Sequence, residues 1–279
     1  MRNIIFFLLF FLSFFVEAQI NVMTYNIRNA HADDGVNKWY KRKQSLANVV
    51  LKVNPDILGT QEVLYNQLKD LKKMLPSYDV FGAGRNNGKH AGEHSPVFYS
   101  RGKYEFIKGG NFWLSETPNV PGSKSWDAAI TRICSWVKLK DKETYDEIYV
   151  FNTHFDHRGN VARTKSATLL RHMIDSIAGD KPVVVTGDFN FKPDSEGYTE
   201  MTSEVNEAAF SDSYSPNSPD YTDCGFEVNS KDCSRIDYIF YSQHFIKDSY
   251  TLHTDNNGTY YPSDHLTINV ELRIKRLKI

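Results

Sequence analysis

The segment PVVVTGD, residues 182–188, constrains the fold most strongly, because it is apolar on both faces and then stops at a glycine and an acid. Three consecutive valines followed by Thr186 are typical of a strand buried on both sides, as in a mostly parallel sheet. Asp188 and Asn190 come at the end of this strand. A Gly-Asp pair is also a common turn, so the segment alone leaves a structural and a functional interpretation open.

Similar apolar segments recur along the chain and predict many short strands with few helices. The predicted strands cover residues 20–27, 56–62, 78–82, 95–100, 104–115, 130–140, 147–155, 182–188, 235–242 and 267–274. Helical periodicity predicts helices over residues 38–53, 64–75 and 161–178. Because strands outnumber helices and the central strands are apolar on both faces, we expect an α/β fold with two sheets packed face to face and helices outside.

The N-terminus has the features of a secretory signal. Arg2 precedes an apolar run from Ile4 to Val16, and Val16-Glu17-Ala18 supplies small residues for signal peptidase. The run is too short to cross a bilayer comfortably. We predict that residues 1–18 are removed and that the mature protein is exported, periplasmic or secreted, without stable membrane insertion. An uncleaved membrane anchor is the alternative, and the absence of a cysteine at the cleavage site disfavours a lipoprotein anchor.

Residues 19–279 contain no Pro/Ser/Gly-rich linker, charge block or repeat, so we expect a single domain. The charges are balanced, with 33 basic and 34 acidic residues and a formal net charge of −1. Removing Arg2 and Glu17 leaves this balance unchanged. A protein that holds long duplex nucleic acid by backbone charge usually has a basic surplus. A small or local phosphate-bearing substrate fits the balance better, although a local basic patch remains compatible with it.

The three cysteines allow one disulfide in an exported chain. Cys224 and Cys233 flank a polar, loop-like segment, and we predict a local bridge between them. Cys134 lies in an alternating, strand-like segment and is interpreted as a small buried apolar residue rather than a nucleophile.

Polar side chains follow or begin several of the predicted strands. These residues are Asn26, Glu62, His154, Asp188, Asn190, Asp237, Asp264 and His265. Sheet packing does not require such residues at strand ends, and α/β folds place their sites at one rim of the sheet. The sequence therefore predicts that these side chains form one site.

The predicted site has the residue types that hydrolysis of a phosphate ester needs. Oxygen ligands from Glu62 and Asp264, with Asn26 or Asp237 nearby, suit a hard divalent cation, Mg²⁺ in the first place and Mn²⁺ or Ca²⁺ otherwise. A zinc site would require more His or Cys side chains close together. Hydrolysis also needs a base and donors for the phosphate oxygens, and both are present.

Six motifs in order, TYNIR, GTQEV, FNTHF, GDFN, RIDYIF and SDH, resemble the endonuclease/exonuclease/phosphatase superfamily of deoxyribonuclease-like, metal-dependent phosphohydrolases. The resemblance runs from about residue 20 to the C-terminus. FWLSETP and THFDHRG resemble a bacterial subfamily of exported members. The resemblance implies a four-layer α/β sandwich with its site at one rim between the two sheets.

The resemblance also implies roles for the carboxylate side of the site. Glu62 would bind the catalytic metal, with Asn26 close by. Asp264 would be either a second metal ligand or the orienting partner of His265. His265 would act as the general base or would bind phosphate. Asp237 would hold one of the histidines in its productive tautomer.

Further roles concern the phosphate and the attacking water. By the same resemblance, Asp188 would orient the water or the leaving group, Asn190 would donate to the phosphate, and His154 would stabilise the transition state. Glu93 falls where the deoxyribonuclease branch has a Glu that supports the first catalytic His. Arg28 and Arg132 match that branch as phosphate-contacting residues.

Several alternatives remain open at this point. Asp237 could simply pair with Arg235. His157 and Arg158 could contact substrate or cap the helix that begins near residue 161. The loop between Trp113 and Trp126 could wall the pocket, or its aromatic residues could only anchor the loop itself.

We expect a monomeric, exported hydrolase that cleaves phosphate esters, either diesters or monoesters, and acts on a small molecule or a nucleic acid. A secreted nuclease that degrades DNA or RNA is the enzymatic alternative. A non-catalytic binding domain on the same scaffold is the second alternative.

Overall fold

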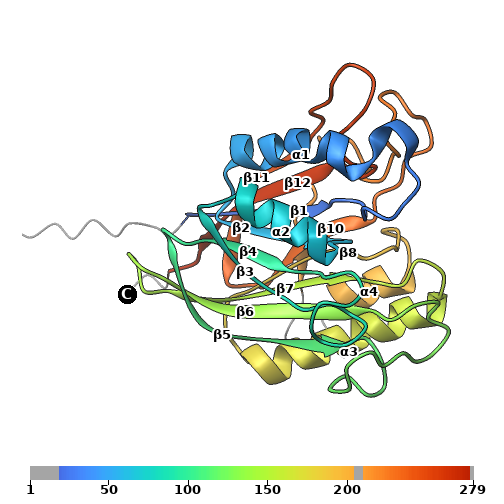
Figure 1. Ribbon diagram of the computed structural model, residues 1–279. Helices are drawn as coiled ribbons and strands as arrows, with labels where there is room; N and C mark the ends of the chain where they lie inside the picture. The colour runs from blue at the N-terminus through green and yellow to red at the C-terminus, as the bar shows by residue number, and fades with distance from the viewer. Residues whose placement is uncertain (1–18, 204–209, 277–279) are drawn as a thin grey trace, which may run out of the picture.

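The computed structural model describes residues 19–203 and 210–276, so the predicted signal segment, residues 1–18, lies outside the described residues. Two six-stranded mixed sheets form the centre of the molecule (Figure 1). The first sheet contains, in spatial order, β11 (Phe245–His253), β12 (Thr267–Ile274), β1 (Gln19–Asn26), β2 (Ile57–Gln61), β4 (Val97–Ser100) and β3 (Tyr78–Phe81). The second contains β5 (Tyr104–Trp113), β6 (Ile133–Asp141), β7 (Glu147–His154), β8 (Val183–Asp188), β10 (Asp237–Tyr241) and β9 (Ser211–Asp212).

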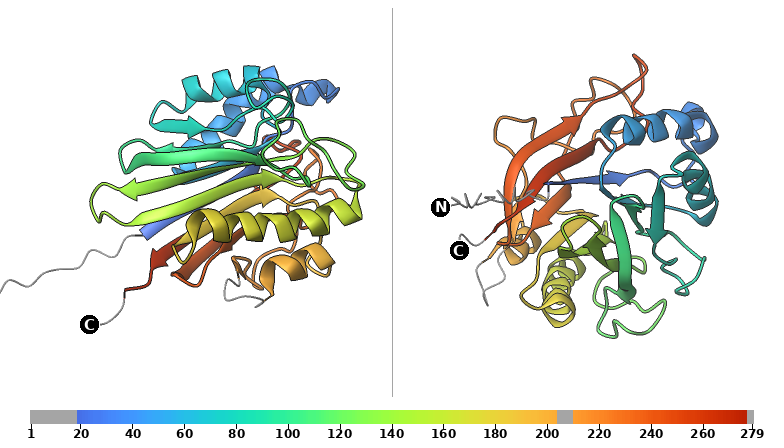
Figure 2. Two further views of the ribbon diagram at one scale, coloured as in Figure 1. Left: turned by 90° about the horizontal axis from the view of Figure 1, so that it is seen from below. Right: turned by 90° about the vertical axis from the view of Figure 1, so that its left-hand side faces the viewer.

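Helices cover the two outer faces of this sheet pair. The helices are α1 (Trp39–Val53), α2 (Tyr65–Met74), α3 (Asn160–Ala178) and the short α4 (Glu196–Thr202), with one 3₁₀ turn at Gly35–Asn37. The helices α1 and α2 pack on the first sheet and α3 and α4 on the second, as Figures 1 and 2 show from different sides. The expected four-layer α/β sandwich is therefore confirmed.

The apolar core between the sheets explains why the central strands are apolar on both faces. Val22 and Ile57 of the first sheet pack against Val150 and Val184 of the second, all of them fully buried. Burying such side chains contributes about 1.5 to 3 kcal/mol each. The second faces of the same strands pack against the helices, so neither face needs polar residues.

A buried polar layer joins the sheets next to the strand ends. Gln61 of β2 donates to Asn152 Oδ1 of β7 at 2.7 Å, and Asn152 donates in turn to the carbonyl of Thr60 at 2.8 Å. Gly59 lies in this layer, and a Cβ there would clash with Thr186 Oγ1 and Asn152 Oδ1. The layer holds the two sheets close together and in one register at this rim.

Four short or marginal elements of the described residues were not predicted from the sequence, and one of them is the 3₁₀ turn at Gly35–Asn37. β11 is an edge strand whose residues are mostly exposed or half-buried, so it lacks an apolar face that a pattern could show. β9 has two residues and α4 has seven, which is too few for periodicity. Within the described residues, no helix combines the length and apolar character needed to cross a membrane.

Candidate active site

The strand register brings polar residues side by side at one rim of each sheet. In the second sheet, Asp188 at the end of β8 lies opposite His154 of β7 on one side and Asp237 of β10 on the other. In the first sheet, the parallel pairing of β1 and β2 sets Asn26 beside Gln61, so that Glu62 follows directly. The predicted site residues thus come from the facing rims of both sheets.

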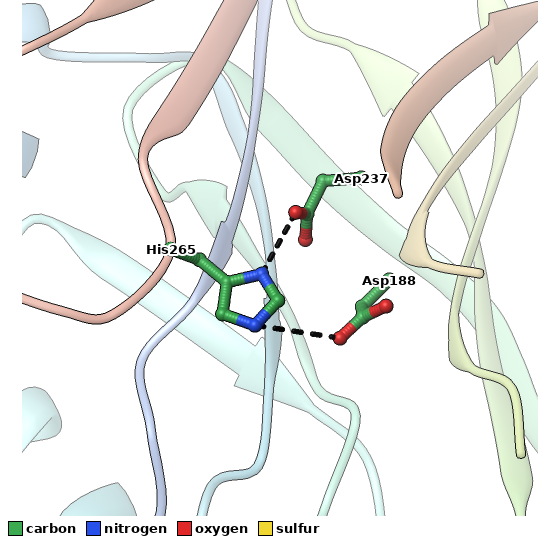
Figure 3. A group of neighbouring side chains, drawn as sticks. All are labelled: Asp188, Asp237 and His265. Carbon is green, nitrogen blue, oxygen red and sulfur yellow. Dashed lines mark hydrogen bonds and ion pairs between the residues drawn. The ribbon is translucent and has the colours of Figure 1, made fainter. Parts of the chain in front are cut away.

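His265 lies between two carboxylates of the second sheet (Figure 3). Its Nδ1 is 2.8 Å from Asp237 Oδ2, and its Nε2 is 3.9 Å from Asp188 Oδ2. Asp237 is therefore the orienting partner of His265, and Asp264 is not. Burial lowers the pKa of His265, but the Asp237 carboxylate, with Asp188 nearby, outweighs burial and raises the pKa well above its usual value.

Asn26 connects the carboxylates of the two sheets. Its Nδ2 donates to Asp188 Oδ2 at 2.9 Å and to Glu62 Oε1 at 3.2 Å, while its Oδ1 accepts from the Arg28 amide at 3.0 Å. Asn29 donates to the other oxygen of Glu62 from both its backbone and its side chain, at 2.9 and 3.1 Å. The Nδ2 group of Asn26 thus faces the two carboxylates, while its Oδ1, the atom that could bind a metal ion, accepts from the Arg28 amide.

The two carboxylates that Asn26 joins have opposite pKa shifts. Burial and the neighbouring Asp237 raise the pKa of Asp188 to about 7. Burial also raises the pKa of Glu62, but the hydrogen bonds from Asn29 and Asn26 and the nearby His265 outweigh it and bring the pKa below its usual value. Glu62 is therefore an anion over the whole neutral range, whereas Asp188 can exchange a proton near pH 7.

His154 contacts the same oxygen of Asp188 as Asn26 does. Its Nε2 lies 3.3 Å from Asp188 Oδ2, and its buried Nδ1 has no hydrogen-bond partner among the described residues. Burial and the charges of Arg132 and Arg85 lower the pKa of His154 well below its usual value. The imidazole of His154 is therefore neutral, in contrast to that of His265.

Among the described residues, Glu93 does not bond to His154, which is the role that the resemblance implied for it. Its carboxylate forms an ion pair with Arg85 instead, and both side chains are largely buried. The backbones of the two residues are also joined, because the Arg85 amide donates to the carbonyl of Glu93 at 2.9 Å. Arg85 is thus the partner of the Glu93 carboxylate, which the resemblance assigned to His154.

The two predicted phosphate-contacting arginines differ in their surroundings. Arg28 pairs with Asp34 at 3.0 Å and with Asp264 at 3.3 Å and is about one third exposed. Arg132 is buried, 3.1 Å from His157 Nδ1, and its Nε and Nη1 have no hydrogen-bond partner among the described residues. Burial and the nearby Arg85 lower the pKa of Arg132 to about 10, so it keeps its charge at neutral pH.

Asn190 is held on the Asp188 side of the site. Its backbone amide donates to Asp188 Oδ1 at 3.0 Å, and its Nδ2 donates to the carbonyl of Phe155 at 3.1 Å. Arg28, Glu62 and Asn190 all have a positive φ, between +52° and +62°. Such backbone costs on the order of 1 to 3 kcal/mol per residue and is typical of functional sites.

The structure decides most of the remaining alternatives. Arg235 pairs with Asp212 and Asp220 and leaves Asp237 to His265. The N-terminus of α3 is capped by Asp127, which accepts from the amides of residues 161 and 162, and by neither His157 nor Arg158.

The loop at Trp113 is anchored by its aromatic residue. The Trp113 indole donates to the carbonyl of Arg85 at 2.5 Å and thereby fixes this loop to the loop that carries Glu93. Cys134 is buried and unpaired, and burial raises its pKa well above the usual value, as expected of an inert core residue.

These residues surround a cavity of about 410 Å³. The lining consists of Arg28, Asn29, Glu62, Glu93, Ile130, Arg132, His154, His157, Asp188, Asn190, Asp223, Ile236, Asp264 and His265. Apart from imidazoles, the lining contains no aromatic ring, and its aliphatic members are the two isoleucines. A separate hollow of about 310 Å³ between α1 and residues 255–262 is lined by none of the predicted site residues. Arg42 of α1, which was not predicted as a site residue, is part of its lining.

The donor set fits a hard divalent cation. Asp188, Asp237 and His265 each offer a ligand atom within 4.8 Å of the others. However, Asp237 and His265 already use the facing atoms in a hydrogen bond to each other. Glu62 and Asp264 line the cavity, whereas Asp237 is not part of its lining. The low pKa of Glu62 keeps it ionised, while burial raises the pKa of Asp264 against the positive charges of His265 and Arg28. Because they line the cavity, Glu62 and Asp264 are the better candidates for ligands.

Three polar residues at the site were missed by the sequence analysis. Asn29 lines the cavity and donates twice to Glu62. Arg85 pairs with Glu93 and lies close enough to affect the pKa of both His154 and Arg132. Asp223 lines the cavity from the loop that contains the disulfide Cys224–Cys233. No sequence pattern pointed to Arg85, and the cysteine pair was the one indication that the loop of Asp223 has a fixed conformation.

A family model matches most of the chain. Residues 23–265 match the model of the Endonuclease/Exonuclease/phosphatase family. Among curated proteins, nocturnin from Rattus norvegicus is 26% identical over 259 residues, which cover 83% of this chain and 58% of that protein. The match covers less than two thirds of the length of this relative.

Solved structures with the same fold include two from Bacteroides thetaiotaomicron. An endonuclease/exonuclease/phosphatase family protein is 39% identical with a TM-score of 0.88, covering 94% of this chain and 100% of that chain. A protein described as a mannosyl-6-phosphatase is 39% identical with a TM-score of 0.83, covering 91% of this chain and 99% of that chain.

Proposed function

Because this chain belongs to the endonuclease/exonuclease/phosphatase family, we propose that it is a metal-dependent hydrolase that cleaves phosphate esters by attack of an activated water. The observation that carries this proposal is the environment of Asp188 Oδ2. This oxygen lies 2.9 Å from Asn26 Nδ2, 3.3 Å from His154 Nε2 and 3.9 Å from His265 Nε2. A buried carboxylate with a pKa of about 7 in such a setting suits proton transfer at neutral pH.

The pKa shifts assign different roles to Asp188 and His265. Asp188 takes a proton from the attacking water, whose oxygen forms the new bond to phosphorus as the ester oxygen leaves. His265, kept cationic by Asp237, donates to a phosphate oxygen, which is the phosphate-binding role among the two that the resemblance allowed. Arg132 adds positive charge on the same cavity, and Asn190 restrains Asp188 through its backbone amide.

Glu62 and Asp264 would hold the divalent cation, Mg²⁺ in the first place. When bound, such an ion supplies positive charge that neutralises the phosphate oxygens and the leaving oxygen. Arg28 lies beside Asp264 and keeps this carboxylate within the cavity. The alternation of cations and carboxylates around the cavity matches a phosphate group together with its metal ion.

The cavity favours a small phosphomonoester over a nucleic acid. Recognition of bases usually employs aromatic side chains for stacking, and the lining offers none apart from imidazoles. The net charge of −1 supplies no general attraction to a polyanion. The likeness to a protein described as a mannosyl-6-phosphatase supports sugar phosphates as the first substrates to test.

Export belongs to the same proposal. It is supported by the signal-like composition of residues 1–18 and by the disulfide Cys224–Cys233, since disulfides persist mainly in oxidising compartments. Expression of the full chain with detection of the N-terminus of the mature protein would test it. An intact Met1 in the recovered protein would contradict cleavage after Ala18.

Hydrolysis by residues 19–279 across a panel of phosphate esters tests the activity. The panel contains p-nitrophenyl phosphate, bis(p-nitrophenyl) phosphate, hexose 6-phosphates, single-stranded DNA and RNA, each with Mg²⁺, with Mn²⁺ and with a chelator. The near-isosteric Asp188→Asn variant serves as the matched control. Metal-dependent turnover that Asp188→Asn loses supports the proposal. Turnover of nucleic acid alone would favour the nuclease, and binding without turnover would favour the non-catalytic domain.

A further inference from the structure

The carboxylates of the cavity differ in whether other side chains satisfy them. Glu62 accepts from Asn26 and Asn29, while Asp188 accepts from Asn26 and lies next to two histidines. The carboxylates of Glu93 and Asp264 form ion pairs with Arg85 and Arg28, respectively.

Asp223 is the exception among these carboxylates. Within the described residues, its carboxylate has no hydrogen bond or ion pair with another side chain, and the backbone amide of Gly225 is the donor that reaches it. An ionised carboxylate has about four acceptor positions. Most of the acceptor capacity of Asp223 is therefore available to a molecule in the cavity.

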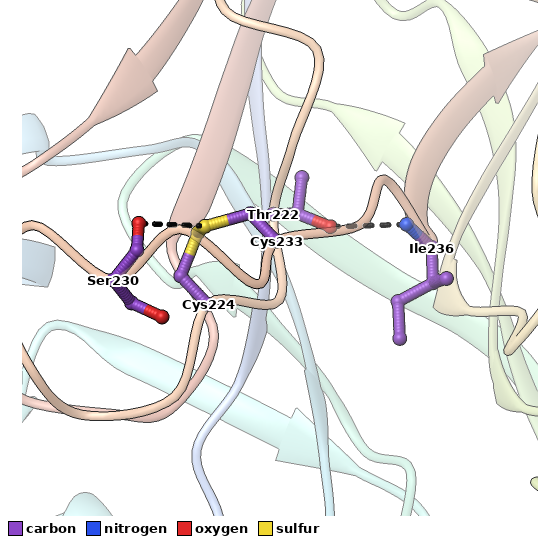
Figure 4. Close-up of a disulfide and its surroundings, with 5 residues drawn as sticks. All are labelled: Thr222, Cys224, Ser230, Cys233 and Ile236. Carbon is purple, nitrogen blue, oxygen red and sulfur yellow. Dashed lines mark hydrogen bonds between the residues drawn. A yellow bond between two sulfur atoms is a disulfide. The ribbon is translucent and has the colours of Figure 1, made fainter.

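The backbone of Asp223 is nevertheless fixed. The backbone of Asp223 exchanges two hydrogen bonds of 2.9 Å with that of Ser234. Its two neighbours bond to the segment that carries His265: the Cys224 amide donates to the carbonyl of Asp264 at 3.2 Å, and the Leu266 amide donates to the carbonyl of Thr222 at 2.6 Å. The disulfide Cys224–Cys233 closes the same loop, and Thr222 Oγ1 accepts from the Ile236 amide at 3.2 Å (Figure 4). An acceptor on so constrained a loop is pre-organised for binding.

The charge of Asp223 indicates which part of a substrate it faces. A phosphate group is attracted to the cations Arg132 and His265 and is repelled by an unpaired carboxylate. Asp223 is therefore suited to the alcohol part of the ester. The aliphatic lining is limited to Ile130 and Ile236, so an apolar or aromatic alcohol gains little contact, whereas a hydroxyl group gains a charge-assisted hydrogen bond.

We propose that Asp223 is a specificity-determining residue that accepts a hydrogen bond from a hydroxyl group of a polyhydroxylated leaving group, such as a sugar. This inference rests on the proposed phosphate-ester hydrolysis and adds the chemical class of the alcohol and the residue that selects it.

The test compares two substrates with the same phosphate group. One is a hexose 6-phosphate, and the other is p-nitrophenyl phosphate, whose leaving group has no hydroxyl donor. The measured quantity is the ratio of their kcat/KM values in the wild type and in Asp223→Ala. The ratio is expected to fall about 10- to 100-fold, as for loss of a hydrogen bond to a charged group.

Two further variants separate recognition from a structural effect. Asp223→Asn retains an acceptor oxygen and is expected to recover part of the ratio. Glu227→Ala removes an exposed carboxylate from the same disulfide-closed loop and is expected to keep the wild-type ratio. Thermal unfolding of all three variants shows whether the loop remains folded.

Several outcomes would overturn the inference. If both kcat/KM values fall in parallel, Asp223 acts on the common phosphate and not on the alcohol. If the ratio is unchanged while calorimetry shows weaker Mg²⁺ binding in Asp223→Asn, the residue belongs to the metal site. If the wild type cleaves p-nitrophenyl phosphate but no hexose phosphate, the inference is refuted and the proposed function stands. If the wild type cleaves no ester of the panel, the proposed function is refuted as well.

Discussion

Asn26 donates a hydrogen bond of 2.9 Å to Asp188, although β1 and β8 belong to different sheets and the two residues lie 162 positions apart. The same amide donates to Glu62. One side chain thus fixes the distance between the carboxylate proposed to bind the metal and the carboxylate proposed to activate water.

The Asn26→Ala variant is expected to lower kcat/KM about 100- to 10,000-fold, because it removes hydrogen bonds to two charged groups, each contributing about 1.5 to 3 kcal/mol. Steady-state kinetics on the most active panel ester provides the measurement. Asn48→Ala, on the exposed side of α1, is the control and should behave as the wild type. Wild-type kinetics in Asn26→Ala would show that Asp188 and Glu62 do not depend on this amide.

The Asp237→Asn variant is expected to lower the pKa of His265, since the Asp237 carboxylate is the main group that stabilises the imidazolium. NMR titration of the His265 ring in metal-free protein measures this pKa directly. A pKa that stays in place would mean that Asp188 and Asp264 suffice to hold the proton.

The same pair predicts the pH dependence of stability. A folded-state pKa of His265 above the unfolded value of about 6.5 stabilises the fold fully below that pH, and this contribution is lost as the pH rises through the folded-state pKa. Asp237→Asn should therefore cost more free energy of unfolding at pH 6 than at pH 9 in metal-free protein. Urea unfolding at both pH values tests the sign, and an equal or larger cost at pH 9 would contradict it.

Arg42 of α1 is expected to be essential for the rim of the first sheet. Its guanidinium donates to the carbonyls of Ile27 at 2.6 Å, Arg28 at 2.7 Å and Pro262 at 3.1 Å, and so joins the end of β1 to the segment that leads to Asp264. Arg42→Ala leaves several buried acceptors unsatisfied, and we expect a loss of about 3 kcal/mol or more.

Denaturant unfolding and Mg²⁺ calorimetry on Arg42→Ala would show both effects, a lower midpoint and a weaker metal affinity. The neighbouring Lys43→Ala removes a partly exposed ion pair with Asp70 and should cost less than about 1 kcal/mol. Equal losses of unfolding free energy in Arg42→Ala and Lys43→Ala would show that the hydrogen bonds of Arg42 to the three carbonyls do not stabilise this rim.

Gly59→Ala is expected to destabilise the protein by about 1 to 3 kcal/mol, because the added methyl group has no space between the sheets. Gly102→Ala is the matched control, since a Cβ at Gly102 meets nothing closer than Ser100 Oγ at 3.9 Å. Thermal unfolding compares the two variants. A stable Gly59→Ala protein would mean that Thr186 and Asn152 can move apart without cost.

The composition of the site could be predicted from the sequence to a large extent. Apolar strands that end in Asn26, Glu62, His154 and Asp188 indicated both the two-sheet core and one shared rim, because burial on both faces leaves no structural reason for polar strand ends. The edge strand β11 could not be predicted in the same way, since an edge that is half exposed has no distinct apolar pattern.

The partners of these residues required the tertiary structure. Asp237 rather than Asp264 orients His265, and Glu93 pairs with Arg85 rather than with His154. Among the residues that the structure describes, Asp223 has no side-chain partner. Local patterns of apolar and polar residues decide where a strand begins and ends, since they depend on burial alone. The pairing of side chains depends on the register between strands distant in the chain and on how two sheets meet, and these are properties of the whole packed fold.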